Sequence, residues 1–256
     1  MSFYDGHKTY PFWLGDYHNP EDMILECLKS ILIRKYNGYK IYIHKMSNFD
    51  VIFLLKYLIK IADVHPTIHN SKIISIQINY GKEGQYHVNF RDSYLILLSS
   101  LAKLCSSFKV ENPKSLFPHL FINDDNLDYI GDVPEFNNFI KVSKLDYQNY
   151  LDSFINKIWS LRDEAIKYCN LDCISLYQVI YKFNQMIFDL FGKNIHKNPT
   201  LPSLAFAIFR SNFMRKENIP QLSGKSLKIL EKVIQEAQLM YLYLKINLEI
   251  KSMDMM

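Results

Sequence analysis

Alternation of apolar and polar residues in the first third of the chain predicts short β-strands. The stretches "KTYPFWLGDY" and "YKIYIH" have the two-residue period of a strand with one buried face. Two longer alternating runs follow in "SKIISIQINYGKEGQYHVNFRDS", where a turn from Gly81 to Gly84 separates them. Alternating runs on both sides of a glycine-containing turn predict a β-hairpin.

Segments with a helical period lie between these strands and after them. "PEDMILECLKSILIRKY" begins with Pro20 and acidic residues, which are typical of a first helical turn. A second helix is expected over 53–61, and a long one over about 161–191. From Gly192 onward the strand pattern ends, so we expect 192–224 to be a connector followed by a second, helical start. Interleaved strands and helices predict an α/β domain with a central sheet.

The composition narrows the class of protein. The 256 residues are 48% hydrophobic and 14% aromatic, which is enough for a substantial core, and the net charge of +4 only permits an anionic partner. Four scattered cysteines without a CxxC pair predict neither a disulfide framework nor a zinc site. No run approaches the roughly 20 apolar residues of a membrane span, and the first residues resemble no leader. The abundant Lys, Asn, Ile and Tyr would follow from AT-rich organelle DNA.

Two sites carry candidate chemistry. Asp50 lies where the strand in "YKIYIH" gives way to the helix, a position that also suits an ordinary first-turn carboxylate. Tyr168 and Asp172 are four residues apart and so share one face of the long helix, as many plain surface pairs do. HExxH, GxSxG and glycine-rich phosphate-loop patterns are absent from the sequence. Hydrolase triads and P-loop chemistry therefore have no support.

Taken together, "HKMSNFD" and "YCNLD" resemble the second and third exonuclease motifs of family B DNA polymerases, in particular the protein-primed branch of fungal mitochondrial plasmids. The resemblance extends over "SFYDG", "HKNPTLPSLAFAIFRSNF" and "IPQLSG". It implies a 3′–5′ proofreading exonuclease with a ribonuclease-H-like fold, a mixed central sheet and flanking helices. Such exonucleases act on the 3′ end of single-stranded DNA with four carboxylates, two divalent metals and a tyrosine.

The resemblance assigns roles to the candidate residues. Asp50 and Asp172 would be catalytic ligands of Mg²⁺ or Mn²⁺, which prefer oxygen donors. Tyr168 would hold the attacking water, and Phe49 would pack against a terminal base.

A further short stretch, "DSYLILL", resembles the family's motif for contact with single-stranded DNA and the terminal protein. Ser93 and Leu97 fit that motif, whereas Tyr94 stands where the family has leucine. A buried strand end is the alternative interpretation of this segment.

The sequence also departs from the family. The first motif, Asp-x-Glu on the opening strand, is missing from the expected exonuclease domain, 1–190, and Lys45 stands where the family has asparagine. A connector toward the polymerase palm is expected over 191–224. The helical segment 225–256 resembles a frameshifted linker, since deleting one base from AT-rich codons for KIFKDIRKSYTGGAVD yields Lys225 to Met240.

Three hypotheses are compatible with these observations. The favoured one is a fragment of a protein-primed DNA-directed DNA polymerase for DNA replication, encoded in mitochondria or on a linear plasmid, and inactive alone. A second is a residual metal-dependent exonuclease that recruits missing ligands from Asp5, Asp16 or Glu26. A third is a non-catalytic module that binds single-stranded DNA or the terminal protein.

Overall fold

We describe the protein from a computed structural model of the chain. It describes residues 1–48, 50–70, 72–110, 116–123, 125–214, 224–225, 228–229 and 232–233. The chain divides into two compact units, Met1–Phe213 and Met214–Met256, and the central sheet and the long helix both lie in the first. The expected tail, 225–256, lies almost entirely outside the described residues, and the boundaries at 190 and 224 stay predictions.

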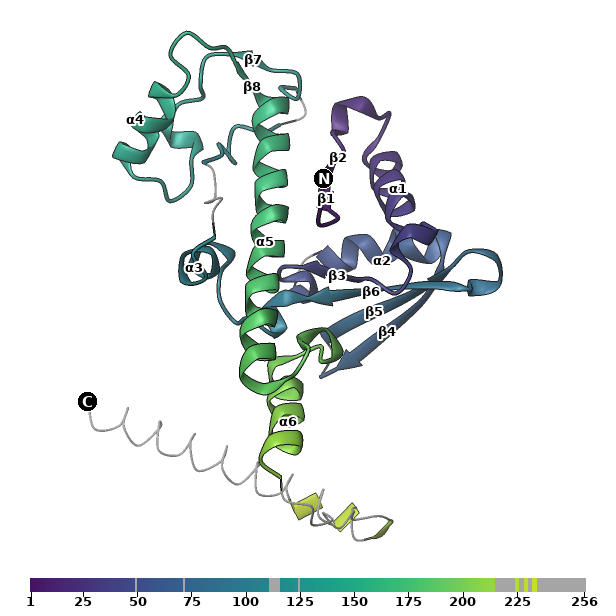
Figure 1. The fold of residues 1–256 in the computed structure, drawn as a ribbon. Helices are drawn as coiled ribbons and strands as arrows, with labels where there is room; N and C mark the ends of the chain where they lie inside the picture. Colours follow the sequence, from purple (N-terminus) through teal and green to yellow (C-terminus); the bar gives the residue numbers. More distant parts are fainter. Residues whose placement is uncertain are drawn as a thin grey trace, which may run out of the picture. The chain divides into compact units, whose positions relative to one another are not determined.

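A four-stranded sheet forms the centre of the first unit (Figure 1). In spatial order its strands are β3 (Lys40–Ile43), β6 (Tyr86–Asp92), β5 (Lys72–Tyr80) and β4 (Asp63–His69). β3 runs parallel to β6, whereas β5 is antiparallel to both β6 and β4, so the sheet is mixed, as predicted. The predicted hairpin is confirmed as β5 and β6, joined by the 3₁₀ turn η4 (Lys82–Gly84).

The edge strand β4 is an element that the sequence analysis did not predict. Its segment contains Pro66, and nearly all of its residues are exposed. Proline lacks the N–H that a central strand must donate, but an edge strand can place it where no neighbour needs that donor. The polar, proline-containing pattern is therefore compatible with β4 only because β5 alone pairs with it.

Helices α1 (Pro20–Ile31) and α2 (Asp50–Ile61) cover one face of the sheet (Figure 1). The side chain of Asn19 accepts a hydrogen bond from the N–H of Asp22 and so caps α1, which ends earlier than the predicted segment. A 3₁₀ turn, η2 (Arg34–Tyr36), follows it. Both helices bury their apolar stripes against the inner residues of β5 and β6, which are Ile76, Ile78, Val88 and Phe90.

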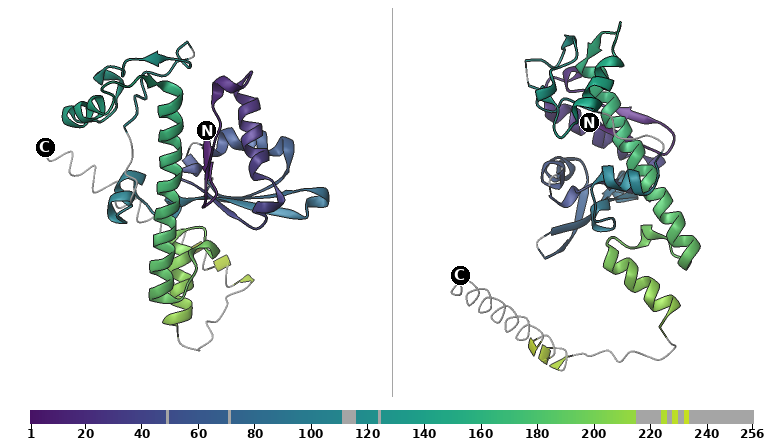
Figure 2. Two further views of the ribbon diagram at one scale, coloured as in Figure 1. Left: turned by 45° about the horizontal axis from the view of Figure 1, so that its top comes forward. Right: turned by 90° about the vertical axis from the view of Figure 1, so that its left-hand side faces the viewer.

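The first residues form a small separate hairpin instead of a long strand. β1 (Ser2–Tyr4) pairs antiparallel with β2 (Thr9–Pro11), and a 3₁₀ turn, η1 (Leu14–Asp16), follows. The strand predicted in "KTYPFWLGDY" is thus confirmed only over its beginning. Both short strands lie alongside the long helix α5 (Leu161–Phe191), as the two views of Figure 2 show.

The 31-residue helix α5 has the predicted bounds and organises the rest of the unit. Its Gly192 C-cap has φ of 64°, a left-handed conformation that glycine adopts without steric cost. Three apolar clusters lie along α5 and include residues of α3 (Leu101–Ser107), α6 (Leu201–Asn212) and the region around β7 (Ile130–Gly131) and β8 (Trp159–Ser160). The remaining elements are α4 (Lys144–Asp152) and the 3₁₀ turns η3 (Met46–Asn48), η5 (Ser93–Leu95), η6 (Phe136–Asn138) and η7 (Ile195–Lys197).

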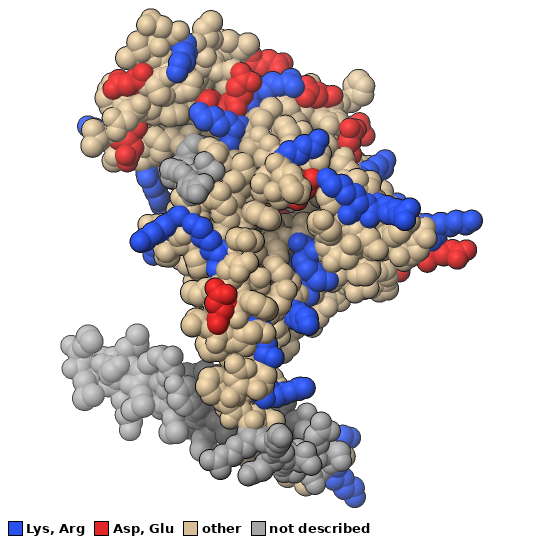
Figure 3. Space-filling view, in the orientation of Figure 1, with Lys and Arg blue, Asp and Glu red and all other residues tan. Residues whose placement is uncertain are grey.

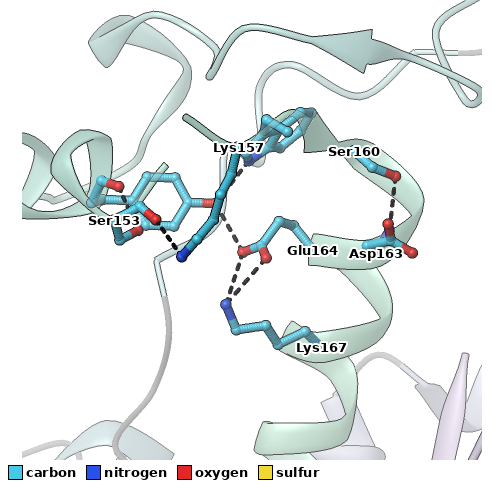
Figure 4. Close-up of polar contacts among 8 residues, drawn as sticks. Ser153, Lys157, Ser160, Asp163, Glu164 and Lys167 are labelled. Carbon is cyan, nitrogen blue, oxygen red and sulfur yellow. Dashed lines mark hydrogen bonds and ion pairs between the residues drawn. The ribbon is translucent and has the colours of Figure 1, made fainter. Parts of the chain in front are cut away.

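A polar network fixes the N-terminal end of α5 (Figure 4). Ser160 caps the helix by accepting from the N–H of Asp163 at 3.3 Å. The buried carboxylate of Glu164 accepts from the hydroxyl of Tyr150 at 3.0 Å and from Nζ of Lys167 at 3.1 Å. Because buried charge is tolerated when it is paired and hydrogen-bonded, this network holds the first turns of α5 in place. Tyr168 lies one turn after Glu164 on the same helix.

Candidate functional site

Asp50 is the first residue of α2 and stands just past the end of β3, as predicted. Between the strand and the helix the chain forms a turn over residues 44–48 that includes η3. A carboxylate at a helix N-terminus is stabilised by the helix dipole. Lys45 in this turn has φ of 66°, a left-handed conformation that asparagine adopts more readily than lysine. The family's asparagine at this position would therefore suit the backbone better.

The turn over residues 44–48, called here the Asp92 turn, is held by a buried carboxylate that the sequence analysis missed. Asp92 is 1% exposed. It accepts hydrogen bonds from the N–H groups of Lys45 and Ser47, both at 2.9 Å, and from that of Tyr94 at 2.8 Å. A signal was present in the sequence, because Asp92 interrupts the apolar alternation that Val88 and Phe90 establish on β6.

Asp50 itself has an unfavourable environment for a charge. Burial raises the pKa of Asp50, and the negative charge of nearby Asp92 raises it further, against a backbone hydrogen bond that lowers it. Burial and a like charge both disfavour an ionised carboxylate. A cation bound beside Asp50 would reverse this balance, so the carboxylate is suited to ligand binding more than to stability.

Asp50 lines a largely apolar cavity of about 540 Å³. Residues from β1, α1, β3, α2 and α5 surround it. The second carboxylate that lines the cavity is Asp5. It accepts hydrogen bonds from Nζ of Lys35 at 2.5 Å and from the hydroxyl of Tyr36 at 3.1 Å. Burial raises the pKa of Asp5, but these and further hydrogen bonds outweigh it and hold the pKa well below its usual range. Asp5 is thus held in its ionised form, whereas burial and Asp92 disfavour the ionised form of Asp50.

Helix α5 borders the same cavity with residues next to the predicted Asp172. Cys173, Tyr177 and other residues on one face of α5 line the cavity, and Asp172 does not. Asp172 precedes Cys173 and so lies about 100° around the helix, beside this face. The structure therefore brings Asp50 to the cavity and puts Asp172 next to the face that borders it.

Tyr168 lies on the adjoining face of α5. Its ring centroid is 5.2 Å from that of Phe117 and 5.3 Å from that of His119. These contacts belong to the apolar cluster around Trp159 and Leu161, which the network in Figure 4 adjoins. Tyr168 and Asp172 are on one helix, as predicted, and the pair remains a prediction as a catalytic unit.

The predicted DNA-contact residues have mixed surroundings. Phe49 lies outside the described residues. Ser93 is 0% exposed, and its hydroxyl is 3.0 Å from Nδ1 of His44. Leu97 packs against the apolar clusters along α5. A fully buried hydroxyl reaches no ligand in this conformation, so for Ser93 the geometry favours the alternative of a buried strand end.

Tyr94 is the member of that motif with a partly accessible ring. The ring centroids of Tyr94 and His44 are 5.7 Å apart, and Nζ of Lys45 lies 5.6 Å from the Tyr94 centroid. Aromatic rings combined with a cation form the kind of surface on which unpaired bases stack. Tyr94 therefore lies beside the Asp92 turn with a partly accessible ring, and its role as a DNA contact stays a prediction.

Of the acidic residues considered as substitute ligands, only Asp5 lines the cavity with Asp50, and it is already hydrogen-bonded. Asp16 is paired with Arg162 through two contacts of 2.8 Å, and Glu26 is exposed on α1. Across the described ranges, no three His, Cys, Asp or Glu side chains come together as a possible metal site.

None of the helices in the described ranges has the length and hydropathy that a membrane span requires.

Comparison with known proteins identifies the family. Residues 30–237 match the family described as DNA polymerase type B, organellar and viral. The chain is 37% identical over 264 residues to a probable DNA polymerase of Neurospora intermedia, covering 99% of this chain and 27% of that protein. It is 34% identical to one of Ascobolus immersus, covering 89% of this chain and 20% of that protein. A probable DNA polymerase of Agaricus bitorquis is 30% identical over 73% of this chain and 24% of its own length.

The chain spans roughly a fifth to a quarter of the length of these relatives. No solved structure matches it. The family match covers most of the chain, including Asp50, Asp172 and the segment predicted to be a connector. The chain therefore belongs to the organellar and viral family of type B DNA polymerases.

Proposed function

We propose that this chain is the 3′–5′ exonuclease region of a protein-primed DNA polymerase, with a ribonuclease-H-like fold, and that it binds the 3′ end of single-stranded DNA. On this proposal the parent polymerase replicates mitochondrial or linear-plasmid DNA and can contact a terminal protein through the segment around Tyr94. The single observation that carries the proposal is Asp50. Asp50 lines a cavity, at a strand-to-helix junction held by Asp92. The face of α5 that runs from Cys173 to Ile180 borders the same cavity.

The apolar walls of the cavity suit a terminal base. Phe53 and Tyr177 line it together with aliphatic side chains of α1 and β3. Every nucleobase has a face that stacks on aromatic rings, so such a cavity binds an unpaired 3′ nucleotide without regard to sequence. Proofreading requires that tolerance, because any of the four bases can be misincorporated.

The described residues do not complete a metal site. Asp50 is the carboxylate of the cavity whose pKa is raised, and no cluster of three ligand side chains occurs in the described part of the chain. Two-metal phosphodiester hydrolysis needs several carboxylates around two cations. We therefore expect no polymerase activity and little or no exonuclease activity from this chain alone.

The free edge of β3 is where further carboxylates could be supplied. The N–H of Asn89 donates to the carbonyl of Tyr39 at 3.0 Å, a parallel register that turns the backbone groups of Ile41 toward β6. The backbone groups of Lys40 and Tyr42 then point away from β6, toward the cavity that β3 also lines. A further strand paired along this edge would carry its side chains past Asp50.

Photo-crosslinking of the chain to a single-stranded oligonucleotide tests the proposal without requiring catalysis. A photoreactive thymidine at the 3′ terminus should crosslink to the cavity segments 50–54 and 173–180, and the same base placed internally should not. Asp50→Ala should leave the terminal crosslink in place, since the apolar walls hold the base. Terminal crosslinks spread over the surface would contradict the proposal.

The alternative of a non-catalytic binding module is favoured by the incomplete carboxylate set in the described ranges. A non-catalytic module and a residual exonuclease are distinguished by incubating a 5′-labelled oligonucleotide with the chain and Mg²⁺ or Mn²⁺. Degradation that Asp172→Ala abolishes, and that the matched surface variant Asp189→Ala does not, would establish a residual exonuclease. Binding that is unchanged by chelator and accompanied by no degradation would favour the module.

A further inference from the structure

The face of the sheet opposite α1 and α2 carries a group of cations. Because side chains alternate along a strand, Phe90 faces α2 and its neighbour Arg91 faces the other way. The parallel register pairs Tyr42 with Arg91 and Lys40 with Asn89, which puts Lys40 and Arg91 on the same face. His196 of η7 reaches this face, where its Nδ1 lies 2.9 Å from the hydroxyl of Tyr42.

This group of side chains, called here the cationic cluster (Lys40, Arg91 and His196), lacks an acidic partner among the described residues. Lys40 and Arg91 carry its positive charge near neutral pH, since burial and both cations lower the pKa of His196. Nε and Nη1 of Arg91 are buried and make no hydrogen bond to any of those residues. None of the ion pairs in the described part of the chain involves a cluster member. Asp63 lies at the far edge of the sheet, where it pairs with His65 at 2.7 Å.

The three groups also act on one another. Burial lowers the pKa of Lys40, and the charge of Arg91 lowers it further. Burial likewise lowers the pKa of His196, with added contributions from Arg91 and Lys40. Like charges that repel in a partly desolvated place destabilise the fold unless an anion compensates them.

The geometry selects among possible anions. Arg91 contributes a guanidinium charge whose Nε and Nη1 are buried, and Lys40 adds a second charge from the neighbouring strand. Two converging cations favour an anion with several oxygens and more than one negative charge, such as phosphate, over a single carboxylate. In the view of Figure 3, Lys and Arg side chains also outnumber Asp and Glu beside the C-terminal half of α5. A chain of phosphates could follow such a surface.

We propose that Lys40, Arg91 and His196 form a binding site for a backbone phosphate of single-stranded DNA, on the face of the sheet opposite α2. The site rests on the proposed function only in that DNA is the ligand. It lies apart from the Asp92 turn, because Arg91 and Asp92 point to opposite faces of β6. Lys40 also lines the cavity assigned to the terminal base, so a phosphate bound by the cluster would belong to the same strand, close to its 3′ end.

Fluorescence anisotropy with labelled dT and dA oligonucleotides at several salt concentrations tests the site. For single strands, each phosphate contact contributes about 0.7 to the slope of log affinity against log salt. Lys40→Gln and Arg91→Gln should each reduce that slope by about 0.7, equally for both sequences, whereas Arg91→Lys should retain it. Lys29→Gln and Lys103→Gln, which remove exposed charges from α1 and α3, are the matched controls.

A second measurement guards against variants that fold poorly. In the unsubstituted chain, the oligonucleotide should raise the pKa of His196, followed by NMR, because a bound phosphate offsets the charges of Arg91 and Lys40. Inorganic phosphate serves as the comparison ligand. An equal rise with inorganic phosphate and none with DNA would overturn the DNA assignment.

Other results would also overturn the site. If Lys40→Gln and Arg91→Gln leave the salt slope unchanged, the cationic cluster binds no phosphate of DNA. The proposed function would still stand in that case, provided that terminal crosslinks to the cavity persist. If the unsubstituted chain binds no DNA at all, both proposals fail. Loss of stability in Arg91→Gln with unchanged DNA binding would instead assign the cluster to a protein carboxylate.

Discussion

Arg91 and Asp92 are adjacent on β6, yet their charged groups have very different surroundings. Asp92 points toward the α2 side and accepts three backbone N–H groups, all within 2.9 Å. Arg91 points to the opposite face, where two of its buried nitrogens have no partner among the described residues. A buried charge with a full set of hydrogen bonds supports the fold, whereas one without them costs stability and is suited to a ligand.

The same contrast holds between the two acidic residues near the cavity. Asp92 organises the turn that presents Asp50, and Asp50 has its pKa raised by burial and by Asp92. One carboxylate is a structural support for the other. Substitutions at these residues test this division, and the largest effect is expected at Asp92.

Asp92→Ala should lower the free energy of unfolding by about 3 kcal/mol. The substitution leaves the N–H groups of Lys45, Ser47 and Tyr94 buried without acceptors, and each such group costs about 1–3 kcal/mol before the turn relaxes. Urea unfolding measures the loss. Asp189→Ala, on the exposed side of α5, should change stability by less than about 0.5 kcal/mol. A loss below about 1 kcal/mol for Asp92→Ala would contradict the supporting role.

Arg91→Met should leave stability unchanged or raise it by about 1 kcal/mol. Replacing a buried, unpaired charge by an apolar side chain of similar length removes a desolvation cost. Thermal unfolding in the absence of DNA measures the change, with the exposed Arg34→Met as control. A clear loss of stability would mean that the guanidinium has a stabilising partner, and the contrast with Asp92 would disappear.

Asp50→Asn should raise the free energy of unfolding slightly, by about 0.5 kcal/mol, at the low end of common stabilising substitutions. The raised pKa of Asp50 means that its ionised form is disfavoured in the folded chain, so neutralising it stabilises the fold above about pH 4. The measurement is thermal unfolding near pH 8 with chelator present. Asp189→Asn should have no such effect, and destabilisation by Asp50→Asn would show that the charge supports the helix start.

Acidification from pH 7 to pH 5 should have a small destabilising effect through His44 and His196. Burial lowers the pKa of both imidazoles below their ordinary value of 6.5. The unfolded chain therefore binds protons first, and the stability that both groups contribute above pH 6.5 is lost as the pH falls below it. Urea unfolding at each pH measures this dependence. His196→Gln should reduce it, and an unchanged dependence in that variant would exclude His196 as a source.

Sequence patterns predicted the local elements of this chain well. The β5–β6 hairpin and the bounds of α5 follow from two-residue and helical periods that end at glycines. The position of Asp50 at a strand-to-helix junction followed in the same way, and the family was recognised from motifs around it. These features depend on residues close together in the chain, where propensity and periodicity act directly.

The sequence patterns did not predict features that depend on distant pairing. β4 was missed because Pro66 is acceptable only at an edge, and edge position is a property of the whole sheet. Asp92 was missed because its partners, Lys45 and Ser47, lie more than forty residues earlier in the chain.

The amino-acid sequence by itself determined the family, the hairpin and the long helix. It also determined that Asp50 lies where strand β3 gives way to helix α2. Only the tertiary structure decided which charges are satisfied, since that depends on the parallel pairing of β3 with β6. That pairing brings Lys40 close to Arg91 on one face of the sheet. On the opposite face it places Asp92 next to the turn that precedes Asp50. Parallel strands need a long connection, here through α2, β4 and β5, so no local pattern encodes their register. The physical reason is that a side chain's hydrogen-bond partners and solvation are set by the neighbours that folding supplies.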